Sequence, residues 1–309
     1  MSLNDLILFV VIFGSTLLAV VFPDVGAVFQ PYLLYIMMFI LFLSFMKIDF
    51  HVLLDTSPRA MLGLAKLVVI KLLVLPVLLY WITIWIIPDY AVPVLLLSGV
   101  STGVVGPFIA TLVNAEVSQV ARMVVVTSVL VPISLPGLVK LLAGADISIP
   151  LELMVWMLAV AIFVPMAAVL FMRRFLPGVL HAMDKLRFPL SLGAFAATNF
   201  GVFSQYSSFF YQNVGQILMA VAVAYVLSVI YYFIGFVVSP KQKPVDKLAA
   251  GVSLAIVNNV LVIVFSSQFF GPLSPTLAAM YMFPFFTMIV PVKLIMNMGL
   301  LSAPSSEEP

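Results

Sequence analysis

The chain has 309 residues, of which 64% are hydrophobic and only 8% are charged, and its formal net charge at pH 7 is +2. Soluble domains carry about a quarter charged residues, so this composition excludes an ordinary water-facing surface and indicates a protein embedded in a lipid bilayer. The few positive charges are dispersed, which excludes the clustered basic surface of a nucleic-acid-binding protein. There is no cysteine, so disulfides, thiolate metal sites and cysteine nucleophiles are excluded too.

Ten apolar segments follow one another along the chain, each about the length that a helix needs to cross a bilayer. Turn residues or charges separate them, as at Pro23-Asp24 and Arg173-Arg174. The first segment lacks the basic start and the small-residue cleavage site of a signal peptide, so we interpret it as a retained helix. The predicted spans cover residues 5–22, 31–47, 59–87, 91–113, 120–143, 151–172, 188–207, 214–238, 246–269 and 275–301.

Basic residues predict the orientation of these spans. Loops on the N-terminal side carry Lys47, Arg59, Arg122, Arg173, Arg174, Lys185, Arg187, Lys241, Lys243 and Lys247. The loops on the opposite side carry only Lys140. The positive-inside rule therefore places both termini in the cytoplasm. We expect a multi-pass protein of a bacterial or archaeal cell (inner) membrane.

Two spans contain polar or helix-weakening residues near their middle. The fourth contains Ser98 to Gly103 and then Gly106-Pro107, and the ninth contains Gly251-Val252-Ser253 and then Asn258-Asn259. Paired interruptions at matching places of two halves are typical of secondary transporters with inverted repeats, which bind substrate where the interruptions meet. The alternative is that these small residues only ease the packing of membrane helices.

The predicted fold class is therefore an all-α integral membrane protein. It has ten transmembrane helices arranged as two inverted five-helix repeats, with broken helices four and nine that cross. A repeat of five spans is inverted because five is odd. The repeats cover about residues 1–145 and 146–301 of a single transmembrane unit, and residues 302–309 are expected to form a disordered cytoplasmic tail.

Several motifs occur in the order found in a known family. They are Pro31-Tyr32-Leu33-Leu34 leading to Phe45-Met46-Lys47-Ile48-Asp49-Phe50, then Leu97-Ser98-Gly99, Val126-Thr127-Ser128-Val129, Ile133-Ser134-Leu135-Pro136, and Val257-Asn258-Asn259 with Phe265 to Phe270. In order and spacing, over nearly the whole chain, the sequence resembles a divergent member of the bile acid:sodium symporter family, in the bile acid/arsenite/riboflavin transporter superfamily. The resemblance implies panel and core subdomains, with helices four and nine crossing in the core.

The same resemblance implies secondary active transport by alternating access. Related transporters carry bile acids, other organic anions, pantoate-like acids, arsenite or auxin. The family's two sodium ions are bound by polar side chains, several of which are replaced here. Gly106-Pro107-Phe108 offers no side-chain oxygen, Leu254 stands at the glutamate position of helix nine, and Lys71 stands at the glutamine position of helix three. Asn258 can stand in for the helix-nine glutamine, and Thr127 is retained.

Lys71 is the most unusual residue of the predicted spans. It lies about 13 residues past the cytoplasmic end of its span, or roughly 19 Å at the rise of an α-helix, which is near the middle of a bilayer core. We hypothesise that its ammonium replaces a sodium ion and is held by backbone carbonyls of the broken helices, Asn258, Asn259 and Thr127. It could also exchange a proton or pair with an anionic substrate. The alternative is that Lys71 lines a wet crevice.

Other candidates are weaker. Ser101 and Thr102 belong to the interruption of the fourth span, and Asn199 of the seventh span would face the substrate cavity or form an interhelical hydrogen bond. Lys66 and Lys293 are close enough to their span ends to reach the interface. Tyr231-Tyr232 fits an interfacial aromatic belt. His51 and His181 both fall in predicted loops.

The leading functional hypothesis is a secondary transporter of a small, anionic organic solute, either proton-coupled or uncoupled. Alternatives are a sodium-coupled symporter with divergent ligands, or a channel or sensor that keeps the fold. An intramembrane enzyme is disfavoured because no carboxylate, histidine or cysteine lies at membrane depth. No nucleotide-binding loop is present, and we expect neither a cofactor nor a metal. The expected partners are the substrate and the lipid bilayer.

Overall fold

The computed structural model describes residues 3–48, 57–144, 150–239, 243–289 and 291–292. Within these ranges the chain is helical and contains no β-strand, apart from one isolated bridge. The first half contains α1 (Leu3–Val21), α2 (Pro23–Ala27), η1 (Gln30–Tyr32), α3 (Leu33–Phe45), α4 (Pro58–Val69), the π-turn η3 (Ile70–Val74), α5 (Leu75–Ile86), η4 (Pro88–Tyr90), α6 (Ala91–Gly99), α7 (Gly106–Leu112) and α8 (Val117–Ala143). The second half contains α9 (Leu151–Phe175), α10 (Pro177–Ser204), α11 (Ser207–Gln212), α12 (Val214–Val238), α13 (Pro244–Ala255), α14 (Asn259–Phe269), α15 (Leu273–Met280) and α16 (Met282–Thr287).

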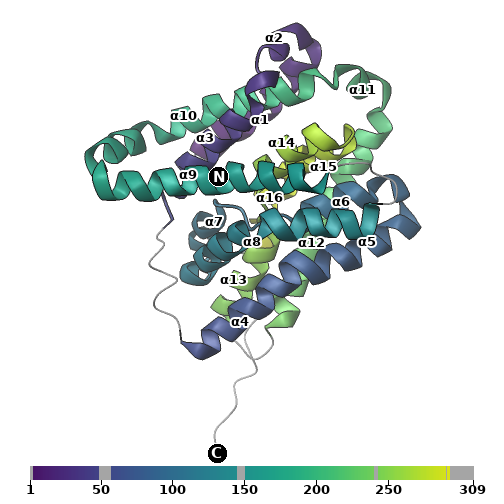
Figure 1. Ribbon diagram of the computed structural model, residues 1–309. Coiled ribbons are helices and arrows are strands. Elements are labelled where there is room, and N and C mark those ends of the chain that lie inside the picture. The colour runs from purple at the N-terminus through teal and green to yellow at the C-terminus, as the bar shows by residue number, and fades with distance from the viewer. Residues whose placement is uncertain (1–2, 49–56, 145–149, 240–242, 290, 293–309) are drawn as a thin grey trace, which may run out of the picture.

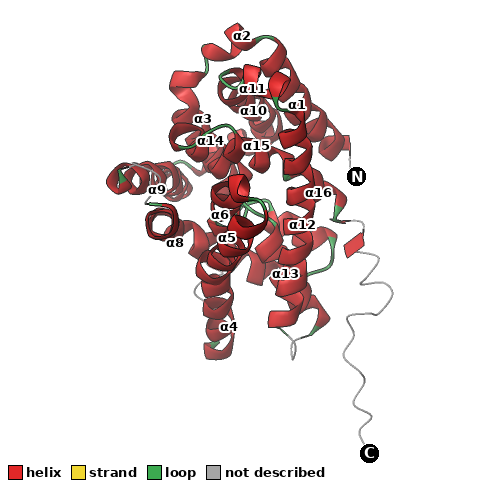
Figure 2. Cartoon of the chain, turned by 90° about the vertical axis from the view of Figure 1, so that its right-hand side faces the viewer, coloured by secondary structure: helices red, strands yellow, loops and turns green. Residues whose placement is uncertain are grey.

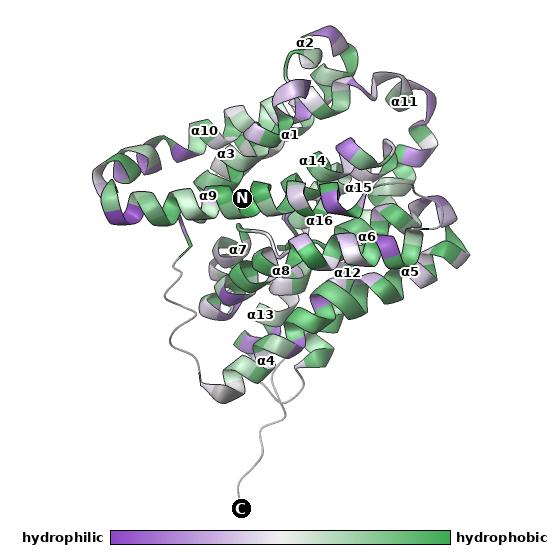
Figure 3. Ribbon diagram, in the orientation of Figure 1, coloured by the Kyte–Doolittle hydropathy of each residue, from purple (hydrophilic) through white to green (hydrophobic). Residues whose placement is uncertain are grey.

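Several long apolar helices indicate a membrane-embedded protein (Figure 3). Among the described residues, five helical stretches are long and apolar enough to span a bilayer: Pro23–Phe45, Ala60–Ile86, Val117–Ala143, Leu151–Phe175 and Val214–Val238. Large apolar side chains on them point outward, including Trp85, which is 84% exposed, and Ile133, which is 72% exposed. In water such exposure would be unfavourable, whereas lipid solvates it.

By their contacts the helices are divided here into two sets, and the names panel group and core group are labels for these sets. The panel group contains α1, α2, α3, α9 and α10, which pack on one another. The core group contains α4 to α8 and α12 to α16. In Figures 1 and 2, α1, α2, α3 and α10 lie together at one end of the molecule, whereas α4 and α13 lie at the other. The groups meet where α8 packs on α9, and where α14 touches α3 and α10.

The predicted loop between the sixth and seventh spans is wrong. The helix α9 continues to Phe175 and α10 begins at Pro177, so His181 and Lys185 lie on a helix. The prediction took charged residues as the sign of a loop, but a charged stretch can also form a helix. Pro177 favours a helix start, since a proline at the first helical position sacrifices no hydrogen bond.

Basic side chains join neighbouring helix ends in the panel group. An Nη of Arg173 on α9 donates to the carbonyl oxygens of Phe45, Met46 and Ile48, at 3.4, 2.9 and 2.6 Å, and so closes the C-terminus of α3. Nearby, Nζ of Lys47 donates to the Asp184 carboxylate on α10 at 2.9 Å. This hydrogen bond holds the pKa of Asp184 below its ordinary value.

Two predictions concern parts of the chain outside the described residues. The proposed disordered tail at 302–309 and the snorkelling of Lys293 both lie there.

Candidate functional site

The fourth predicted span is interrupted, as expected. The helix α6 ends at Gly99 because Val100 adopts an extended conformation, with φ −74° and ψ 161°. A non-helical stretch follows, and α7 begins at Gly106 with Pro107 in its first turn. The hydroxyl of Ser98 donates back to the carbonyl of Val94 and stays within its own helix. The interruption leaves backbone groups of residues 100–105 without helical partners.

The ninth predicted span is interrupted in the same way. The helix α13 ends at Ala255, and α14 begins at Asn259. Between them Ile256 leaves the helical conformation, with φ −85° and ψ 97°. The side-chain oxygen of Asn258 accepts a hydrogen bond from the amide of Leu261 at 3.3 Å and caps α14.

The two interruptions cross through backbone hydrogen bonds. Thr102 and Val257 form an antiparallel bridge. The amide of Gly103 donates to the carbonyl of Ile256 at 2.7 Å, and the amide of Asn258 donates to the carbonyl of Ser101 at 3.0 Å. A Cβ atom on Gly103 would lie 2.6 Å from the carbonyl oxygen of Val257. Glycine is therefore required for the two backbones to approach this closely.

The carbonyls at the end of α13 are all bonded. Four successive oxygens accept hydrogen bonds from other segments: Ser253 from Oγ1 of Thr102 at 2.8 Å, Leu254 from Nζ of Lys71 at 3.0 Å, Ala255 from the hydroxyl of Tyr281 at 2.8 Å, and Ile256 from the amide of Gly103 at 2.7 Å. Helix C-termini normally leave such carbonyls unpaired. Here donors from three other segments close the helix end.

Lys71 supplies the only full charge among these donors. It lies in η3 and is 0% exposed. Its ammonium lies 5.2 Å from the centroid of the Tyr231 ring, within the range of a cation–π interaction. The negative end of the α13 dipole also favours a cation there. Within the described part of the chain, no carboxylate forms an ion pair with Lys71.

The prediction of the groups that bind Lys71 is correct for a backbone carbonyl and wrong for the side chains. A carbonyl of a broken helix does bind the ammonium, but the side chains of Asn258, Asn259 and Thr127 do not. Asn258 is used as the α14 cap. Nδ2 of Asn259 donates to Sδ of Met282 at 3.1 Å. These side chains are committed to the local geometry of the interruptions, which sequence spacing does not reveal.

Thr127 fixes the first interruption against α8. Its Oγ1 accepts a hydrogen bond from the amide of Thr102 at 3.0 Å and donates to the carbonyl of Met123 at 2.6 Å. Both Thr127 and Thr102 are 0% exposed. The two threonines therefore join α8, the α6–α7 interruption and α13.

Several buried oxygens near the crossing have no hydrogen-bond partner in the described part of the chain. They are Oγ of Ser101, Ser128 and Ser253, and Oδ1 of Asn259. Buried polar atoms usually have partners, so these oxygens can bind a water or a hydrogen-bonding solute. Of the two predicted site residues in this interruption, Ser101 therefore has a hydroxyl that can bind a solute, whereas the Thr102 hydroxyl is already bonded to the Ser253 carbonyl.

Asn199 lies away from the crossing, in the panel group. Its Nδ2 donates to the carbonyl of Ile12 and to Oγ of Ser15, both at 2.9 Å, and joins α10 to α1. The side chain is almost fully buried. This is the interhelical hydrogen bond that the sequence left open as the alternative to a substrate contact.

Lys66 and Tyr231 were both predicted to lie near the membrane interface, and the structure places them differently. Lys66 is exposed and its Nζ donates to the carbonyl of Val238 at 2.9 Å, closing the C-terminus of α12 near the interface. Tyr231 does not belong to an interfacial belt, because it is 0% exposed and lies against Lys71.

Gly235 and Gly251 allow α12 to approach α13, since a Cβ on Gly235 would lie 2.4 Å from Gly251.

No model of a protein family matches this chain, and no curated protein matches it significantly.

Proposed function

We propose that this protein is a secondary active transporter that moves a small organic solute by alternating access. The observation that carries the proposal is the crossing of two interrupted helices, bonded through Gly103, Ile256, Ser101 and Asn258. Interrupted helices that meet inside a bilayer are a recurring means of building a solute site. Here the polar atoms left without a partner at the crossing are side-chain oxygens, Oγ of Ser101 and Ser253 and Oδ1 of Asn259.

The distribution of helices between the two groups supports an inverted repeat of ten spans. The first two spans of each half, α1 with α2–α3 and α9 with α10, belong to the panel group. The last three of each half belong to the core group. In each half the fourth span is interrupted by an extended segment, while the fifth spans differ, since α8 is continuous and its counterpart is divided into α15 and α16. The shared grouping and the matching interruptions are expected if the halves are related, and a panel and a core that move against each other would give alternating access.

We further propose that Lys71 takes the place of a coupling sodium ion. Backbone carbonyls are ligands for hard cations, and at the end of α13 an ammonium fixed to the protein already bonds one of them at 3.0 Å. Near Lys71 the described residues supply no carboxylate to balance a second cation. Transport is therefore expected to be independent of a sodium gradient, and either proton-coupled or uncoupled.

We also propose that the solute is anionic, but this has less support than transport of a small organic solute in general. Direct pairing of Lys71 with an anion was one reason for it, but in this conformation the ammonium is bonded within the protein and is 0% exposed. The broader class, a small organic solute, is what the crossing supports.

Reconstitution into liposomes tests this function. The vesicles are offered a mixture of small organic acids, amines and neutral solutes, and accumulated solutes are identified by mass spectrometry. Imposed pH and sodium gradients are varied separately. Saturable uptake that ignores sodium is expected, and it is concentrative under a pH gradient if transport is proton-coupled. Sodium-driven accumulation would contradict the role of Lys71, whereas binding without uptake, or ionic current at channel rates, would contradict the transporter.

A further inference from the structure

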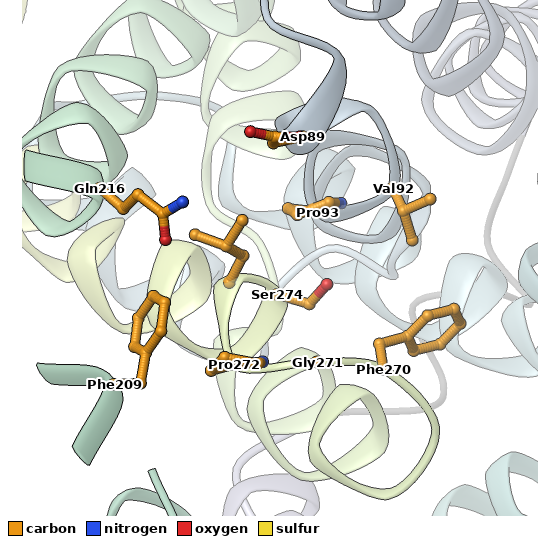
Figure 4. Close-up of a pocket in the computed structure, with 10 residues that line it drawn as sticks. Asp89, Val92, Pro93, Phe209, Gln216, Phe270, Gly271, Pro272 and Ser274 are labelled. Atoms are coloured by element: carbon orange, nitrogen blue, oxygen red, sulfur yellow. The ribbon is translucent and has the colours of Figure 1, made fainter. Parts of the chain in front are cut away.

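A cavity of 410 Å³ lies at the outer ends of the two half-helices α6 and α14 (Figure 4). Its walls come from η4 and the start of α6, from α11 and α12, and from the turn between α14 and α15. Small-molecule sites have volumes of about 300–1,000 Å³, so the cavity is large enough for a small ligand. None of the site residues predicted from the sequence lines it.

Three polar side chains from three segments border this cavity. They are Asp89 of η4, Gln216 of α12 and Ser274 of α15. Across the described residues none of these side chains has a hydrogen-bond or ion-pair partner. Ser274 is only 3% exposed as a residue, and its hydroxyl forms no hydrogen bond within these residues. Figure 4 shows the three side chains around the same space, so their polar atoms are available to one bound molecule.

The wall that carries Asp89 and Gln216 is held in place by Tyr90. The hydroxyl of Tyr90 donates to the backbone carbonyl of Gln216. Burial, and secondarily the Asp89 carboxylate, raises the pKa of Tyr90 to about 12, so this hydroxyl keeps its proton at neutral pH. The carboxylate and the amide are therefore presented on a fixed surface.

The chemistry of the lining selects the ligand. Among the described residues, Asp89 is the only charged one that borders the cavity, and the rings of Phe209 and Phe270 line its walls. A carboxylate forms strong charge-assisted hydrogen bonds with a protonated amine, and aromatic rings favour cations and apolar groups. The Gln216 amide and the Ser274 hydroxyl can add hydrogen bonds.

We propose that this cavity binds a small organic cation, a primary ammonium carried on a short aromatic or apolar body. The ligand would contact the start of α6 and the residue that follows α14, while the opposite ends of both helices meet at the crossing. The site is distinct from the crossing, and its binding does not require that the protein transports anything.

Isothermal titration calorimetry on the full chain in lipid nanodiscs tests this site. The probes are 2-phenylethylammonium, neutral 2-phenylethanol and anionic phenylacetate, which share a ring and chain length but differ in charge. The ammonium is expected to bind saturably and about tenfold or more tighter than phenylacetate, a difference that one charge-assisted contact can supply. No saturable binding of the ammonium, or equal binding of phenylacetate, would overturn the proposal.

Three variants locate the binding. Asp89→Asn should remove most of the preference for the ammonium, whereas Asp24→Asn, which neutralises a second exposed carboxylate that does not border the cavity, should keep it. Gly271→Phe should weaken all three probes, because a Cβ there meets no atom within 4 Å and the added ring can enter the cavity. Unchanged ammonium affinity in Asp89→Asn and Gly271→Phe would place the binding elsewhere and refute the site.

Discussion

Lys71 and Arg173 each close the C-terminus of another helix, as Lys66 does for α12, and the surroundings of the first two differ. Lys71 closes α13 in a site with 0% exposure, where its ammonium contacts a carbonyl and an aromatic ring. Arg173 closes α3 at one end of the panel group, beside the exposed pair of Lys47 and Asp184. Water can replace a lost contact at the second end but not at the first. The same kind of contact is therefore expected to matter much more at the crossing.

The largest effect is expected from closing the space between the crossing backbones. Gly103→Val places a Cβ 2.6 Å from the Val257 carbonyl oxygen, a backbone atom that cannot move aside. The variant should lose at least about 3 kcal/mol of stability, the upper range for overpacking a core. Thermal unfolding in detergent measures the loss. Gly137→Val is the matched control, because a Cβ on Gly137 meets no atom within 4 Å, and equal stability of the two variants would contradict the crossing.

A smaller effect is expected from one hydrogen bond at the same place. Thr127→Val keeps the shape of the side chain but leaves the buried amide of Thr102 without its acceptor. An unpaired buried group costs about 1–3 kcal/mol. Thr83→Val is the control, since Thr83 is also buried but bonds only the carbonyl of Leu79 in its own helix. If both variants unfolded at the wild-type temperature, the hydrogen bond of Thr127 would not contribute to stability as proposed.

The smallest effect is expected at the exposed ion pair. Asp184→Asn should change stability by under about 1 kcal/mol, because solvent screens a pair whose side chains are 52% and 37% exposed. Lys47 lowers the pKa of Asp184 in the folded protein. The pair therefore contributes above the unfolded pKa of about 4 and is lost as the pH falls through the lower, folded value. Unfolding curves of wild type and variant at neutral and acidic pH measure this, and a difference that grows towards low pH would have the wrong sign.

The sequence is sufficient to predict an all-helical fold and the places where two of the helices are interrupted. Runs of apolar residues marked the long helices, and Ser98 to Gly103 and Asn258-Asn259 marked the interruptions because small and polar residues weaken a membrane helix. Charged residues are a poorer guide to where a helix ends. The stretch around Lys185 was predicted as a loop but continues α10, since a charged face does not prevent a helix in water.

The partners within the site could not be predicted from the sequence. The depth of Lys71 follows from helix rise, but its bond to the Leu254 carbonyl depends on how η3 approaches α13. Tyr231 resembled an interfacial residue because it sits in an aromatic pair, whereas packing of α12 on α13 buries it. The cavity at Asp89 was missed because its walls come from four separated segments, which no local pattern connects.

The most direct test of the central claim is solute uptake into liposomes by wild-type protein and by Lys71→Ala, Lys71→Gln and Lys71→Arg, with and without sodium and across a range of pH. Lys66→Ala is the matched control, because Lys66 lies on the same continuous helix but is exposed at its end. The wild type and the control should take up solute equally with or without sodium, and the Lys71 variants should lose about tenfold or more in rate, the effect of about 1.4 kcal/mol. Unchanged rates and pH profiles in all three Lys71 variants would contradict every functional role for this residue.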